Sequence, residues 1–165
     1  MEIKVTFLQQ LKNKVERILH VKGNYNGGIL EMAMIIDHQL PKDVVQQVVP
    51  ELLQILKRHS EVFRNVRLNV VDWKGDAVIE NRVSPMSMVM MSGFYDDYEQ
   101  IPEKKEFLPL VEYLKMYQAR AKLIILVTDG SYGNEQPELA KKSMQPFLGK
   151  KMMQIVIHAD SMEIL

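Results

Sequence analysis

The chain of 165 residues contains no cysteine, no excess of charge of either sign and no long apolar run. Without cysteine it has neither disulfide bonds nor thiolates for catalysis or metal binding, and a reducing compartment is compatible with that. Equal numbers of acidic and basic residues, 21 of each, remove the main electrostatic reason to expect nucleic acid or an anionic membrane surface as a partner. No apolar run approaches the roughly 20 residues of a membrane span, and the first residues lack the layout of a signal peptide. We therefore expect a cytoplasmic protein that binds neither nucleic acid nor membrane.

Common motifs of cofactor chemistry are also missing. The sequence has no Gly-rich phosphate loop, either of the dinucleotide-binding type or of the Walker type. Its four histidines are not spaced as zinc ligands are; they are His20, His38, His59 and His158. Carboxylates are therefore the residues to examine for a site.

Two apolar segments each end on an aspartate. Residues 123–127 run directly into Thr128 and Asp129, and residues 30–36 end on Asp37. Both segments have the length and the apolar content of strands that are buried on both faces. Neighbouring parallel strands lie about 4.8 Å apart, so adjacent strands would place both aspartates in one crevice at the carboxyl end of the sheet. Such paired acids hold a cation, share a proton or meet a basic side chain, whereas an isolated Asp-Gly pair is also typical of a plain turn.

The rest of the chain alternates between helical and strand patterns. The expected helices are 7–19, 43–59, 102–118 and 137–147, and the expected strands are 29–36, 66–72, 77–83, 123–128 and 152–157. This order predicts an α/β, doubly wound, Rossmann-like fold: a mostly parallel sheet with one antiparallel edge strand and helices on both faces. We expect one domain over residues 1–165, with a core from 28 to 159 and an N-terminal helical extension over 1–23. The methionine-rich run 86–91 fits a further strand, core filler or an adaptable binding face.

Four segments in this order resemble a von Willebrand factor A-like domain, of the bacterial type that accompanies a metallopeptidase domain. They are Met34-Ile35-Ile36-Asp37, Asn69-Val70-Val71-Asp72, Phe107 to Leu114, and Ile125 to Gly130. The resemblance implies that the strands bearing Asp37 and Asp129 are neighbours. It also implies a metal-ion-dependent adhesion site, in which an Asp-x-Ser-x-Ser run, a Thr and a second Asp hold a divalent ion that a partner's acid completes. Here that site is degenerate, because Gln39 and Pro41 replace the serines and Lys105 falls at the threonine position.

These replacements leave several interpretations of the crevice open. In the first, the Lys105 ammonium takes the place of the ion and pairs with Asp37 and Asp129, so that the site is metal-free; in a second, Lys105 is a solvated residue at a helix start. In a third, Asp37 and Asp129 still bind Mg²⁺ or Mn²⁺. An enzyme alternative is a small hydrolase or phosphotransferase with Asp37 as nucleophile, although Gln39 stands where such enzymes carry a general acid.

The sequence thus predicts a non-catalytic protein-interaction module that needs no cofactor and has another protein as partner. The predicted contact residues are His38, Gln39, Lys105 and Ser131 at the crevice, with Phe94, Tyr95 and Asp96 in a polar and aromatic loop beside it. A plain connecting loop is the alternative for the last three. The segments 66–72 and 77–83 are separated by a short Gly-containing turn and are expected to form a hairpin. A structural subunit that assembles through the edge of this hairpin is a further possibility.

Overall fold

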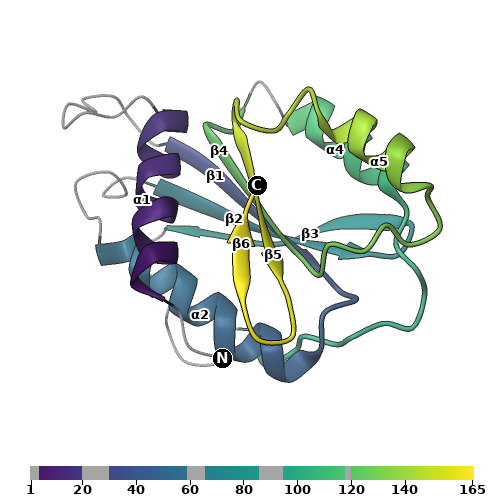
Figure 1. The fold of residues 1–165 in the computed structure, drawn as a ribbon, viewed down its shortest axis with the longest axis horizontal. Helices are drawn as coiled ribbons and strands as arrows, with labels where there is room; N and C mark the ends of the chain where they lie inside the picture. The colour runs from purple at the N-terminus through teal and green to yellow at the C-terminus, as the bar shows by residue number, and fades with distance from the viewer. Residues whose placement is uncertain (1–3, 20–29, 59–65, 86–94, 118–119) are drawn as a thin grey trace.

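The computed structural model describes residues 4–19, 30–58, 66–85, 95–117 and 120–165 (Figure 1). Two parts of the sequence-based prediction, Phe94 and the methionine-rich run 86–91, lie outside the described residues.

Six strands form a single sheet in the order β3-β2-β1-β4-β5-β6. The four inner strands are parallel: β1 (Leu30–Asp37), β2 (Val66–Lys74), β4 (Leu123–Thr128) and β5 (Met152–Ile157). Antiparallel strands close the two edges: β3 (Ala77–Pro85) and β6 (Met162–Ile164). The predicted α/β class with a mostly parallel sheet is therefore confirmed. Strand β6 is an addition that the sequence pattern did not indicate, because three residues are too few to show a strand period.

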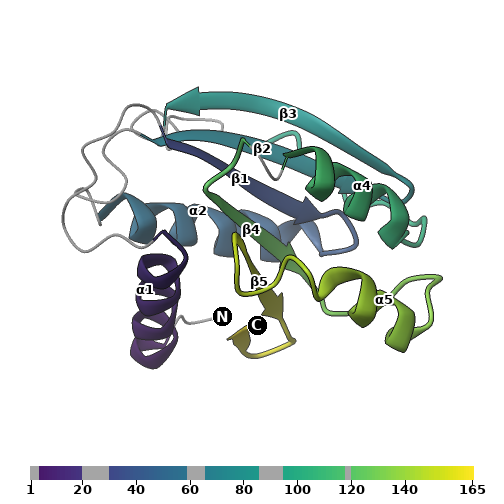
Figure 2. The same ribbon diagram turned by 90° about the horizontal axis from the view of Figure 1, so that it is seen from above.

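Helices cover both faces of this sheet (Figures 1 and 2). Helices α1 (Val5–Leu19) and α2 (Lys42–Arg58) pack on one face, and α4 (Phe107–Tyr117) and α5 (Pro137–Met144) pack on the other. Successive side chains of a strand point to opposite faces, so both faces of a central strand need apolar residues. In β1, Met34 belongs to the α1–α2 core and Ile35 to the α4–α5 core, and both are fully buried.

The helix predicted from residue 102 begins only at Phe107. Residues 95–106, which we call the strap, have no helical or strand structure apart from turns. The backbone of Glu106 explains the late start, because its N–H donates to the Gly75 carbonyl at 2.9 Å and its carbonyl accepts from Trp73 Nε1 at 3.1 Å. Contacts with the end of β2 thus hold the last residue of the strap outside the helix.

None of the helices in the described part of the chain combines the length and the apolar character needed to cross a membrane.

Candidate binding site at the carboxyl edge of the sheet

Asp37 and Asp129 lie at the point where the chain reverses its direction of travel across the sheet. From β1 the chain adds β2 and β3 on one side, and it then returns to add β4 on the other side of β1. Strands β1 and β4 pair in parallel, with Ile36 beside Val127, so both strands end at the same edge. Asp37 is the last residue of β1, and Asp129 follows β4 directly. In doubly wound sheets this switch point is where ligands bind.

Lys105 reaches this point from the strap and contacts both aspartates. Its Nζ donates to Asp37 Oδ2, to Asp129 Oδ1 at 2.5 Å and to Thr128 Oγ1 at 3.2 Å. An ammonium group has three N–H donors, and here three acceptors meet them. The contacts of Lys105 with both aspartates, which one interpretation of the sequence predicted, are therefore confirmed, while a metal-free site stays a prediction. We call Asp37, Lys105, Thr128 and Asp129 the acidic centre.

The acidic centre is largely closed to solvent. Lys105 and Asp37 are 0% exposed, and the side chain of Asp129 is 31% exposed. Lys105 Nζ also lies 5.5 Å from the centroid of the Trp73 ring, within the range of a cation–π interaction. Burial on its own would raise the pKa of Asp129, but hydrogen bonds from Lys105 and Ser131 outweigh it and hold that pKa below its ordinary value.

A glycine in the loop after β4 allows the strap to approach. Gly133 has φ of +60°, and a Cβ atom at this position would lie 2.1 Å from the carbonyl oxygen of Lys105. The backbone N–H of the next residue, Asn134, donates to the same Lys105 carbonyl oxygen, with an N–O distance of 3.5 Å. Only a residue without a side chain fits so close to the backbone of Lys105.

A second buried network fixes the other end of the strap. Asp72 Oδ1 accepts from the Tyr95 hydroxyl at 2.5 Å and lies 3.0 Å from His38 Nε2, and its Oδ2 accepts from Asn81 at 2.7 Å. Burial would raise the pKa of Asp72, but the contacts with His38, Tyr95 and Asn81 outweigh it and lower that pKa. His38 Nδ1 donates to the Glu99 carbonyl at 2.7 Å.

Asp72 is a site residue that was not predicted from the sequence, although it ends an apolar segment just as Asp37 does. It was assigned to a hairpin, which is correct, since β3 follows it. Its partners Tyr95 and Asn81 are, respectively, 23 and 9 residues away in the chain, so spacing alone does not show the network.

The remaining predicted contact residues divide into surface and interior. Ser131 and Asp96 are exposed and Gln39 is half-buried. Ser131 donates from both its N–H and its hydroxyl to Asp129 Oδ1, at 2.9 and 2.8 Å. Tyr95 and His38 are each 1% exposed, as deeply placed as Lys105, so a partner at this edge would meet the surface above these three residues.

The acidic centre as it stands does not fit a divalent metal ion. A hard cation needs several free oxygen ligands, whereas the Lys105 ammonium already contacts both carboxylates and the Thr128 hydroxyl. The Gln39 side chain is held to the strap, because its amide nitrogen donates to the Glu103 carbonyl at 2.8 Å. Among the described residues, no group of three or more His, Asp or Glu side chains is placed to hold a metal ion.

Nor is Asp37 placed to act as a nucleophile. Its Oδ1 accepts from the Gln39 N–H at 2.9 Å, and its Oδ2 accepts from the Thr128 hydroxyl at 2.7 Å as well as from Lys105. Both oxygens are thus engaged, and the residue is fully buried. A nucleophile needs a free lone pair directed at a substrate.

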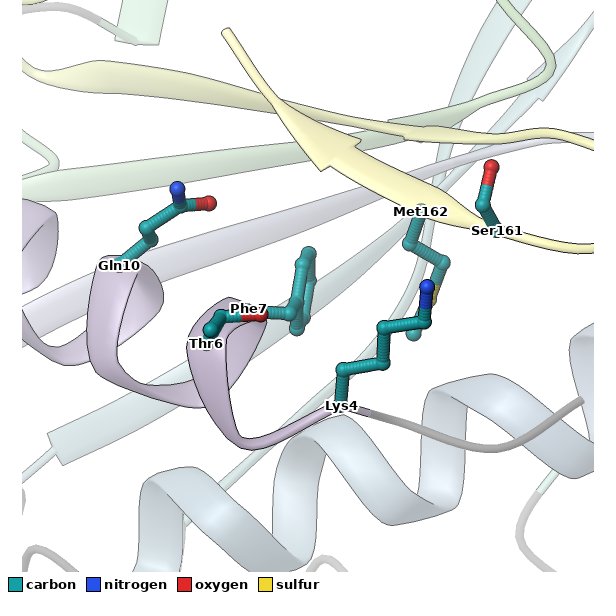
Figure 3. A pocket seen from close by; sticks show the side chains of 6 residues that line it. All are labelled: Lys4, Thr6, Phe7, Gln10, Ser161 and Met162. Carbon is teal, nitrogen blue, oxygen red and sulfur yellow. The ribbon is translucent and has the colours of Figure 1, made fainter.

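A small cavity of about 90 Å³ lies between the start of α1 and the start of β6 (Figure 3). Its lining residues are Lys4, Thr6, Phe7, Gln10, Ser161 and Met162. None of the site residues predicted from the sequence is among them, and neither is any member of the acidic centre.

Comparisons of the chain with models of known protein families and with curated protein sequences find no match. The fold and the site together define an α/β protein with a doubly wound sheet and a buried lysine between two aspartates at its switch point.

Proposed function

We propose that this chain is a non-catalytic protein-interaction module of the von Willebrand A type, with a degenerate adhesion site that works without metal, in a cytoplasmic setting. The observation that carries the proposal is the engagement of Asp37 and Asp129 by the buried ammonium of Lys105. The contacts that would hold an ion or activate a nucleophile are taken up inside the protein. The edge of the sheet therefore offers a shaped, pre-organised surface, and such a surface favours binding over chemistry.

The charge on the strap indicates the kind of partner that fits. Of its charged side chains, only Lys105 is buried, and the exposed ones are Asp96, Asp97, Glu99, Glu103, Lys104 and Glu106. One basic side chain is thus set against five acidic ones, in a chain whose overall charge is zero. A partner with basic side chains would be complementary to this surface and would be steered to it.

Site-specific photo-crosslinking tests the proposal in the source cells. A photoreactive amino acid replaces either Ser131, which is exposed beside the acidic centre, or Asp96, which is exposed next to Tyr95 at the other end of the strap. Glu112, exposed on α4, is the matched control. We expect both test positions to give the same discrete adduct, weakened by high salt and unaffected by a chelator, and the control position to give none. Adducts from Glu112 alone, or none from either test position, would contradict the proposal.

Two alternatives, a divalent-metal site at Asp37 and Asp129 and catalysis with Asp37 as nucleophile, are tested on the purified protein. Isothermal titration of chelator-treated protein with Mg²⁺ and Mn²⁺, with Asp129→Ala as control, should give no site-dependent heat. A screen of generic phosphoesters should give no turnover that Asp37→Asn abolishes. Micromolar to low millimolar binding that vanishes in Asp129→Ala would establish a metal-dependent module instead.

A further inference from the structure

The acidic centre has the composition of a cation-binding site. Two carboxylates and a hydroxyl, all oxygen ligands, converge on one position from the ends of β1 and β4. The group at that position, Lys105 Nζ, is the terminal atom of a long side chain that enters from a different segment. Its charge balances one of the two carboxylates, so the centre keeps a net negative charge.

The strap that carries Lys105 is held by contacts that do not involve its side chain. The Ile101 N–H donates to the His38 carbonyl at 3.0 Å, and the Tyr98 hydroxyl donates to the Leu40 carbonyl at 2.6 Å. At the other end Glu106 is bonded to Gly75. Removing the Lys105 side chain alone therefore leaves its backbone in place and opens a cavity that ends at the carboxylates.

We infer that the acidic centre is a cation site whose ligand is supplied by the protein itself, and that Lys105 acts there as a tethered cation. In its absence the site takes a small free cation, with a primary alkylammonium ion as the closest match to the lysine head group. This inference deepens the proposed function, because it rests on the same metal-free site. It concerns only the interior of that site, so its test needs no protein partner and can fail while partner binding holds.

Chemical rescue of Lys105→Ala tests the inference. The truncation deletes the three outer methylenes and the ammonium, and n-propylammonium replaces those atoms. Removing one partner of a buried ion pair should lower the Tm by roughly 6–20 °C for a domain of this size. The matched control is Lys104→Ala, because Lys104 is the adjacent residue and is exposed. Tm is measured by circular dichroism with n-propylammonium, with n-propanol, with Mn²⁺ and without additive.

We expect n-propylammonium at millimolar concentrations and above to raise the Tm of Lys105→Ala, because a ligand that binds only the folded state stabilises it. The same concentrations of n-propanol should not do so, since the alcohol lacks the charge, and neither additive should raise the Tm of wild type or Lys104→Ala. A rise with Mn²⁺ as well would mean that the site accepts any small cation. Rescue should disappear in Asp37→Asn/Lys105→Ala, which lacks the buried charge.

Three results would overturn the inference. The first is a Tm of Lys105→Ala equal to that of wild type. The second is equal rescue by n-propanol, which would assign Lys105 a packing role only. The third is a Lys105→Ala variant whose Tm no cation raises, whether it is destabilised or does not fold at all. The double variant Asp37→Asn/Lys105→Ala, folding without additive, would show in that case that the site tolerates loss of the lysine.

Discussion

Replacing Lys105 with methionine is expected to destabilise the protein substantially even though the side chain keeps most of its length. The change removes the ammonium and leaves Asp37, which is 0% exposed, without its charged partner. Two opposite charges about 4 Å apart attract by about 4 kcal/mol at an effective dielectric constant of 20. The cost of leaving one member of a buried pair uncompensated is about 3–5 kcal/mol, and we expect a loss of unfolding free energy in that range.

A double-mutant cycle separates the charge effect from packing. Asp37→Asn keeps the shape of the side chain and leaves Lys105 paired with Asp129, so it should cost less than Lys105→Met. In Lys105→Met/Asp37→Asn both buried charges are gone, and the loss should fall short of the sum of the single losses by about 0.5–3 kcal/mol.

Urea denaturation followed by circular dichroism measures these differences. The fluorescence of Trp73, the only tryptophan in the sequence, is a second probe because its indole is buried and bonded to the strap. An unfolding free energy of Lys105→Met within about 1 kcal/mol of wild type, the range expected for an exposed ion pair, would contradict a buried charge pair at this position. Strict additivity in the cycle would refute the charge coupling.

Three further predictions concern the surroundings of the acidic centre. Gly133→Ala should cost more than about 1 kcal/mol in urea denaturation, because its Cβ would collide with the Lys105 carbonyl oxygen at a positive φ; a neutral change would be inconsistent with that contact. Tyr95→Phe should cost about 1.5–3 kcal/mol, since it removes a hydrogen bond to a buried carboxylate, and an unchanged urea midpoint would argue against it. Unfolding free energy should be level near neutral pH and fall below about pH 4, because the lowered pKa values of Asp72 and Asp129 give stability that is lost as these groups protonate in the folded state; a profile flat to pH 2 would contradict this.

The sequence predicted those parts of the site that depend on strand order. Asp37 and Asp129 each end an apolar segment, and the strand-helix alternation places both segments in one parallel sheet. The choice of Lys105 as their partner came from the family resemblance, since the charged run around it looks like an ordinary helix start. The structure confirms the contacts between these residues, while the binding role stays a prediction.

Other features depend on contacts that no local pattern encodes. The path of the strap was unpredictable because its turns are fixed by partners such as Gly75 and Leu40, which lie far away in the chain. The burial of Tyr95 is an example: an aromatic residue among acidic ones is typical of a surface loop, yet its hydroxyl finds Asp72 inside. Tertiary hydrogen bonds decided the position of this side chain against its local sequence.

The long separations within the acidic centre have a consequence for the order of folding. Asp37 lies 91 residues from Thr128 and 68 residues from Lys105 along the chain. Contacts that close such long loops form slowly, and the strap docks only when β1, β2 and the loop after β4 are already in place. We therefore expect the acidic centre to be among the last parts to form. An incompletely folded or newly synthesised chain would lack the surface above it, so under the proposed function only the completely folded chain would bind a partner.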